Sequence, residues 1–351
     1  MTILGCRLGE GPPLQAIELL GVPGSPYTRK MMALLRYRRL PFQMLWGTHF
    51  DPPEGYPSPK VKLLPTLYWR TATGCETRVD STPLISWLET EFSGRSVQPE
   101  DTVLHVLNLL IEDFADEWLT KAMFHYRWHF APDAEHAAPL LAFWQDPQLP
   151  AANAQQVGRT LAQRQTSRLS MVGSNPITAP VIESSYERLI GILDRIIERQ
   201  GFVLGSRPAS ADFGLYGQLT QLGLIDPTPS RMLDHHSPRL RAWLDRLEDL
   251  SGHAPGPWIE RSSVTPHLGE LLCEIGLVYA PFLVANAQAY HAGHAEFETL
   301  LDGRQWVQPV FAYQVKCLQT LRQARLSLNA ADREDLDQLL AGTGCERMFN
   351  L

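Results

Sequence analysis

Short apolar runs alternate with helical patterns along the first hundred positions of this chain of 351 residues. Short runs bounded by turn residues predict strands, and apolar residues at three- to four-residue steps predict helices. We therefore expect strands over residues 16–20, 42–46, 66–70 and 76–79, and helices over residues 26–38 and 82–92. The turn at residues 71–74 predicts a hairpin between the last two strands. The order β-α-β followed by β-β-α predicts a small α/β domain, and several folds share this order.

From about residue 100 to residue 250 the apolar pattern is helical. Apolar residues at three- and four-residue steps predict a first long helix, with Val103, Leu107, Leu110, Phe114 and Trp118 on one face. Further helices are expected over residues 182–197, 209–224 and 239–247, and Gly201 is a C-terminal stop signal for the first of these. The sequence therefore predicts an all-helical second domain, joined to the first by a linker at residues 93–99.

A proline-rich joint at residues 253–258 leads into about ninety further residues. They are expected to be mostly helical, with a hairpin within residues 297–310 about Asp302-Gly303, a favoured two-residue turn. The expected organisation is an arm (residues 1–15), an α/β domain (16–95), a helical domain (100–250) and a C-terminal extension (258–351).

The amino-acid composition limits the classes of protein to which this chain could belong. A hydrophobic content of 44% with 20% charged residues is ordinary for a globular chain, and 351 residues predict two or three domains. The formal net charge of −7 lacks the basic surplus that nucleic-acid binders normally show. The first ten residues lack the apolar core of a signal peptide, and the most apolar stretch, residues 276–285, is too short to span a bilayer. We expect a buried helix there, and neither a nucleic acid nor a membrane as partner.

Cysteine and histidine spacing gives no sign of a metal or disulfide framework. The five cysteines are scattered, with no CxxC, which favours free thiols in a reducing cytoplasm. His125 and His129 lie four residues apart, but no HExxH context surrounds them, so no metal site is expected. The basic run of the first helix (Arg29, Lys30, Arg36, Arg38 and Arg39) is interpreted as a solvated face.

The turn after the first strand carries the strongest chemical signal. Ser25 stands where an N-cap belongs, and Pro26 occupies the first helical position, where its missing N–H does no harm. The positive end of a helix stabilises an anion beside it, so a bound thiolate could settle against Ser25. The alternative is that Ser25 only caps the helix.

Three later pieces complete a family pattern. They are Leu64-Pro65-Thr66, Asp80-Ser81-Thr82 between a strand and a helix, and the segment Gly205 to Phe213 that opens a later helix. In this order and spacing the chain resembles the glutathione transferase superfamily over roughly residues 16–250. The resemblance implies a thioredoxin-like N-terminal domain, then an all-helical bundle. The C-terminal extension departs from the common pattern.

The resemblance also implies a binding site for glutathione as co-substrate. Ser25 would contact the glutathione sulfur, and Leu64 before a cis Pro65 would offer its backbone to the cysteinyl residue. Asp80 and Ser81 would hold the γ-glutamyl ammonium and carboxylate. The alternatives are an ordinary trans proline at the start of an edge strand and a plain helix cap at Asp80-Ser81.

Further residues have weaker assignments. The run of residues 112–128 would line the pocket for the acceptor substrate, with Asp113, Trp118 and Tyr126 in it and Tyr27 nearby; core packing is the alternative for these side chains. Asp212 is expected to be buried and structural, returning a hydrogen bond to the start of its helix. Relatives commonly form homodimers through the small domain and the first long helices, so a homodimer is expected.

The leading hypothesis is a cytoplasmic glutathione transferase-like enzyme whose glutathione thiolate attacks a small electrophile, with no metal. One alternative is a non-catalytic interaction or scaffold protein, which a cleft plugged by the extension would favour. Another is a glutathione-dependent isomerase or dehalogenase that uses the same binding site.

Overall fold

A computed structural model describes residues 16–49 and 52–349 of the chain; the expected N-terminal arm and Cys6 lie outside the described residues. Within the described residues a four-stranded mixed sheet has the order β2-β1-β3-β4. Its strands are β1 (Ile17–Gly21), β2 (Phe42–Trp46), β3 (Thr66–Thr71) and β4 (Gly74–Val79). β1 runs parallel to β2, which requires a crossover, and α1 (Pro26–Arg38) supplies it. With α2 (Ser81–Glu91) after β4, the expected thioredoxin-like order is confirmed.

The register of this sheet brings three distant segments to one end of it. Leu20 of β1 lies opposite Thr66 of β3, and Thr66 lies opposite Val79 of β4. β1 ends there and leads to Ser25, β3 begins there just after Pro65, and β4 ends there just before Asp80. The three segments that carry the sequence-predicted site therefore emerge side by side.

A helical bundle follows the sheet, as expected. Its helices are α3 (Thr102–Glu117), α4 (Leu119–His129), α5 (Ala131–Phe143), α6 (Ala151–Thr166), α7 (Ala179–Gln200), α8 (Ser210–Thr220), α9 (Pro227–His236) and α10 (Pro238–Leu247). α8 packs against both α1 and α3, which joins the two domains in one core. Gly217 permits this, since a Cβ there would lie 2.5 Å from the carbonyl oxygen of Pro26.

The cap at the start of α8 confirms the structural role expected of Asp212. Its side chain is buried and accepts hydrogen bonds from the amides of Val203 and Ala209, each at 2.8 Å. Ala209 occupies the N-cap position and has no polar side chain, so Asp212 satisfies the backbone there from inside the helix.

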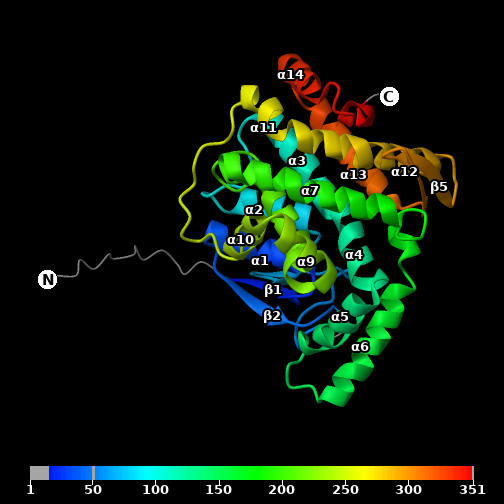
Figure 1. Cartoon of the computed structure of the whole chain (residues 1–351). Coiled ribbons are helices and arrows are strands. Elements are labelled where there is room, and N and C mark those ends of the chain that lie inside the picture. The colour runs from blue at the N-terminus through cyan, green and yellow to red at the C-terminus, as the bar shows by residue number, and fades with distance from the viewer. Residues whose placement is uncertain (1–15, 50–51, 350–351) are drawn as a thin grey trace, which may run out of the picture.

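The extension lies along the bundle, and Figure 1 shows it in yellow to red across α7 and α3. Its elements are α11 (Arg261–Glu274), η3 (Ile275–Tyr279), α12 (Ala280–His291), β5 (Glu296–Leu301), β6 (Arg304–Pro309), α13 (Ala312–Leu326), α14 (Ala330–Leu340) and η4 (Cys345–Met348). The hairpin expected about Asp302-Gly303 is confirmed: both residues have positive φ (52° and 68°), as a type I′ turn requires. α11 packs against α7, while α13 and α14 pack against α3.

The apolar stretch expected as a short buried helix is part of a longer one. The π-helical turn η3 joins α11 to α12, so the helix runs without a break over Arg261–His291, 31 residues. By length and composition this helix of the described chain could cross a membrane, but 61% of its most apolar window is buried within the fold. The buried core helix of a globular protein has the same length and composition, so these two features do not distinguish a membrane span from a core helix.

Candidate functional site

The β1–α1 loop holds Ser25 in a half-buried position at the start of α1. The expected cap is confirmed, because the Ser25 hydroxyl accepts a hydrogen bond from the Thr28 amide at 3.2 Å. Within the described part of the chain the Ser25 hydroxyl proton has no acceptor. It is therefore available to a ligand while its oxygen caps the helix.

Other elements fix this loop through its carbonyl groups. The carbonyl oxygen of Pro23 accepts from Gln221 at 3.1 Å, and that of Gly24 accepts from Arg127 at 3.2 Å. A Cβ at Gly24 would lie 2.6 Å from the Leu141 side chain, so α5 covers the loop closely. The position of Ser25 is thus set by the helical bundle as well as by α1.

Arg127 organises this contact, and sequence reasoning missed it. Arg127 is 3% exposed, and its Nε donates to both carboxylate oxygens of Asp226, at 2.9 and 3.0 Å. Its two remaining nitrogens donate to Gln221 and to Gly24. A buried arginine is retained only where such partners satisfy its charge. The sequence feature that could have indicated a buried arginine is the position of Arg127 between the aromatic residues Tyr126 and Trp128 of the same helix.

The Leu64–Pro65 segment has the expected conformation. The peptide bond before Pro65 is cis. In the described part of the chain the Leu64 amide and carbonyl take part in no hydrogen bond, although the neighbouring Leu63 and Thr66 both do. The half-buried Leu64 therefore offers one backbone donor and one acceptor beside the end of β1.

Asp80 does not cap α2. It has φ of 75°, a conformation that L-residues rarely adopt, and its side chain makes no cap hydrogen bond. Its Oδ2 instead accepts a hydrogen bond from the Tyr313 hydroxyl of the extension at 2.7 Å. Such conformations cost about 1–3 kcal/mol each and occur where surrounding structure enforces them. The plain-cap alternative for Asp80 is therefore excluded.

Ser81 faces a buried ion-pair cluster that the sequence did not indicate. Lys30 is fully buried, and its Nζ donates to Asp116 at 2.6 Å, to Glu112 at 2.8 Å and to the Ser81 hydroxyl at 3.1 Å. Burial would lower the pKa of Lys30, but the charges of Asp116 and Glu112 raise it above its usual value. Ser81 is 5% exposed, and its hydroxyl is committed to this cluster. The interpretation of the basic run as a solvated face is wrong for Lys30 and for Arg38, which is 5% exposed.

Two of the residues expected to line an acceptor pocket lie in the core instead. Trp118 and Tyr126 are each 2% exposed. The Trp118 ring packs 5.3 Å from that of Trp306 in the extension, and Tyr126 stacks on Phe130 at 5.5 Å. The core-packing alternative therefore describes both, and the extension supplies part of that core.

The other two expected pocket residues, Tyr27 of α1 and Asp113 of α3, form hydrogen bonds that connect α3 to other elements. The Tyr27 hydroxyl donates to the carbonyl oxygen of Asp116 at 2.8 Å. Asp113 accepts from the Tyr279 hydroxyl at 2.6 Å, a second contact between α3 and the extension. Both side chains are half-buried.

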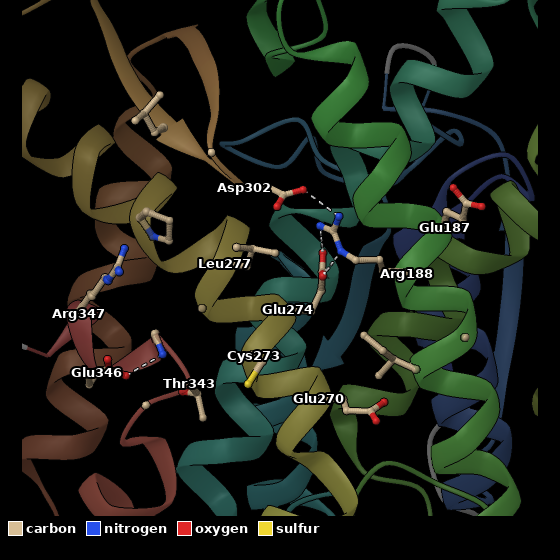
Figure 2. Close-up of a pocket in the computed structure, with 18 of the residues that line it drawn as sticks. Glu187, Arg188, Glu270, Cys273, Glu274, Leu277, Asp302, Thr343, Glu346 and Arg347 are labelled. Carbon is tan, nitrogen blue, oxygen red and sulfur yellow. Dashed lines mark hydrogen bonds and ion pairs between the residues drawn. The ribbon is translucent and has the colours of Figure 1, made fainter.

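An open pocket of about 990 Å³ lies elsewhere, between α7, the helix α11–η3 and the β5–β6 hairpin. Figure 2 shows Arg188 between Glu274 and Asp302, to which it is ion-paired, with Cys273 and Leu277 on the neighbouring helix. None of the sequence-predicted site residues lines this pocket.

No group of three or more potential metal ligands occurs among the residues that the structure describes. The His125 and His129 rings stack at 4.6 Å, and His125 forms hydrogen bonds with Ser174 and Glu183.

Comparison with known protein families gives two matches. Residues 19–96 match the N-terminal domain of glutathione S-transferase, and residues 161–246 match its C-terminal domain. No curated protein matches the chain.

Similar solved structures have low sequence identity to this chain. A glutathione transferase family member from Pseudomonas fluorescens, with bound S-(propanoic acid)-glutathione, is 18% identical over 69% of this chain and 100% of its own, with a TM-score of 0.35. A glutathione S-transferase from Rhodospirillum rubrum is 17% identical over 65% of this chain and 86% of its own, with a TM-score of 0.37. A GST-like protein from Pseudomonas syringae is 16% identical over 69% and 76%, with a TM-score of 0.38.

The two domain matches occur in order along one chain and coincide with the mixed sheet and with the later part of the helical bundle. Residues 19–96 and 161–246 of this chain therefore belong to the N-terminal and C-terminal domains of the glutathione S-transferase superfamily.

Proposed function

We propose that this protein binds glutathione at the end of the sheet where β1, β3 and β4 meet, and that it activates the glutathione thiol for attack on a small electrophile. The observation that carries the proposal is the register Leu20–Thr66–Val79. It places the Ser25 hydroxyl, the unpaired Leu64 backbone and the Asp80 carboxylate around one end of the sheet.

Each part of glutathione has a partner of matching chemistry there. The free proton of the Ser25 hydroxyl and the positive end of α1 suit a thiolate. The Leu64 amide and carbonyl suit the backbone of the cysteinyl residue, which would pair with them as an added strand does. The Asp80 carboxylate suits the γ-glutamyl ammonium.

The γ-glutamyl carboxylate requires a revision of the role expected for Ser81. Because the Ser81 hydroxyl already accepts from Lys30, it is a poor ligand for a second group. The first backbone N–H groups of α2, those of Ser81 and Thr82, remain at the helix N-terminus and suit a carboxylate. We assign the carboxylate to them.

The chemistry follows from the ionised sulfur. A serine hydroxyl cannot form a mixed disulfide, so reductase chemistry through Ser25 is excluded and hydrogen bonding to the thiolate remains. Lowering the thiol pKa by one to two units corresponds to about 1.4–3 kcal/mol of preferential binding to the thiolate. One charge-assisted hydrogen bond and a helix terminus supply free energy of this size. The thiol proton leaves to solvent as the thiolate forms, and the sulfur lone pair then makes the bond to the electrophilic carbon. In a substitution such as dehalogenation, the bond from that carbon to its leaving group breaks and the group departs as an anion. In an addition, the electron pair of the double bond moves to the neighbouring atom, which takes up a proton from water.

A non-catalytic binding role is the second candidate, and the burial of Trp118 against Trp306 of the extension and of Tyr126 against Phe130 of the bundle favours it. Without these aromatic side chains the acceptor pocket loses its expected apolar lining. Glutathione binding with no turnover of any electrophile would indicate this role. A cytoplasmic location, where glutathione is abundant and thiols stay reduced, fits both candidates.

Binding and thiol ionisation test the proposal together. We expect calorimetric titration with glutathione to give saturable heat, and the ultraviolet absorbance of the bound thiolate to titrate below the pKa of free glutathione. The variant Ser25→Ala should raise the pKa of the bound thiol by about one unit, because it removes one charge-assisted hydrogen bond.

The matched control is Asn329→Ala, which removes the N-cap of α14 outside the proposed site. Both variants should lose about 1 kcal/mol of folding free energy with their caps. Only Ser25→Ala should change the thiol pKa. Absence of both heat and thermal shift at millimolar glutathione would reject the proposed function, and an unchanged thiol pKa would reduce Ser25 to a helix cap.

A further inference from the structure

We propose that the extension completes the glutathione site: Tyr313 is a positioning residue that holds the Asp80 carboxylate toward the γ-glutamyl ammonium. This inference rests on the proposed function and deepens it. It assigns a binding role to a segment that lies beyond both matched domains.

The contact joins residues far apart in the chain. The Tyr313 hydroxyl donates to Asp80 Oδ2 at 2.7 Å across a sequence separation of 233 residues. In the described part of the chain no other hydrogen bond or ion pair reaches the Asp80 carboxylate. Because the helix makes no use of this side chain, Tyr313 alone orients it.

The extension holds Tyr313 firmly in this place. The backbone of Phe311, which precedes α13, forms two hydrogen bonds with the side-chain amide of the buried Asn286 of α12: the Phe311 N–H donates to Asn286 Oδ1 at 2.9 Å, and Asn286 Nδ2 donates to the Phe311 carbonyl oxygen at 3.0 Å. Gln314 donates to Glu117 of α3 at 3.1 Å. The residues on both sides of Tyr313 are therefore anchored, and its hydroxyl reaches Asp80 from a preorganised position.

A phenol suits this role better than a cation would. Tyr313 has a pKa well above its usual value because of burial and because of the hydrogen bond to Asp80, so it donates a proton while remaining neutral. It therefore leaves the negative charge of Asp80 intact. A carboxylate accepts about four hydrogen bonds, so one phenol leaves room for an ammonium.

Nearby charges favour a cationic group at this position. Lys30, the cation that lies beside Ser81, is already paired with Glu112 and Asp116. Gln314 of α13 donates to Glu117 in the same region, but burial and the charge of Asp113 raise the pKa of Glu117 to about 8, so this group contributes little negative charge at neutral pH. The site therefore should select thiols that carry the γ-glutamyl ammonium.

The test compares two ligands on two variants. Tyr313→Phe should weaken glutathione binding about five- to tenfold and leave binding of cysteinylglycine, which lacks the γ-glutamyl group, unchanged. The matched control is Tyr290→Phe, at an exposed tyrosine of α12, and should change neither affinity. When Asp80→Asn is already present, adding Tyr313→Phe should weaken glutathione binding little further, because both substitutions disrupt the same Tyr313–Asp80 interaction.

The outcomes separate this inference from the proposed function. If the wild type binds no glutathione, the proposed function itself fails. If the wild type binds and Tyr313→Phe binds equally well or more tightly, the function stands and the positioning role is overturned. An equal loss for both ligands would show a general structural effect and would also overturn it. Should Tyr313→Phe unfold, Asp80→Asn alone must show the same ligand selectivity.

Discussion

Lys30 shows how a single side chain connects the two domains. It extends from α1 and meets Ser81 of α2 and the carboxylates of Glu112 and Asp116 of α3. A buried charge is tolerated because two opposite charges and a hydroxyl replace its water. Without the Lys30 ammonium, the carboxylates of Glu112 and Asp116 would lie close together in the core with no opposite charge beside them.

Lys30→Met should therefore lower the free energy of unfolding by about 3–5 kcal/mol, since it leaves the buried carboxylates unpaired. Urea unfolding measures this. The control Lys60→Met, at an exposed position, should stay within about 0.5 kcal/mol of the wild type. Adding Glu112→Gln and Asp116→Asn to Lys30→Met should recover part of the loss. If Lys30→Met lowers the free energy of unfolding by less than about 1 kcal/mol, the Lys30 charge does not stabilise the cluster.

At the scale of elements, the acidic end of α3 lies beneath the extension. Asp113 accepts from Tyr279 at 2.6 Å, and burial raises the pKa of Asp113 to about 7, although its hydrogen bonds with Tyr279 and Cys317 oppose the change. In the unfolded chain the same group has a pKa near 3.9. The folded state therefore binds a proton between these two pH values that the unfolded state has released.

The contribution of Asp113 to the free energy of unfolding should therefore fall as the pH rises from about 4 to about 7. In this range the folded state keeps a proton on Asp113 that the unfolded state has released, so a lower proton concentration disfavours the folded state. One proton contributes a slope of up to about 1.4 kcal/mol per pH unit. We expect unfolding free energies of the wild type to decline more steeply than those of Asp113→Asn across this range. Parallel curves for the two proteins would contradict the assignment.

At the scale of the whole molecule, the extension packs on the first long helix, which is part of the surface through which the resemblance leads us to expect pairing. α13 and α14 pack on α3, the first long helix, and Tyr313 reaches Asp80 in the small domain. Figure 1 shows these segments, in orange and red, beside α3. A homodimer of the expected kind would need the same surfaces.

We therefore expect the full chain to be a monomer of 39.5 kDa at micromolar concentration. Light scattering coupled to size-exclusion chromatography measures this mass. A mass of two chains would show that pairing uses another face, or that the extension leaves α3 in solution. Hydrogen exchange of α13 would separate these two cases, since a displaced helix loses its protection.

Local signals predicted the elements around the site well. The expected bounds of the first helix and the second strand agree with α1 (Pro26–Arg38) and β2 (Phe42–Trp46). A proline at the first helical position and a hydroxyl before it act within one turn of chain, so neighbouring residues suffice to predict them. The same holds for the Asp302-Gly303 turn, whose positive φ values follow from its two residue types.

Residue patterns could not show which partner covers each side chain. Trp118 resembles an aromatic wall of a pocket until Trp306 packs against it, and Lys30 resembles its exposed basic neighbours until α2 and α3 enclose it. No local pattern in the sequence indicated a role for Tyr313, because its hydrogen-bond partner is an aspartate 233 residues away.

The sequence by itself determined the order of strands and helices, the cap at Ser25, the superfamily and the end of the sheet where its ligand is proposed to bind. These depend on short-range backbone preferences and on motifs a few residues long. Only the tertiary structure decided that the extension lies on α3, buries Trp118 and reaches Asp80. Burial and hydrogen bonding across two hundred residues are properties of the packed core, where each side chain's environment comes from segments that no local pattern identifies.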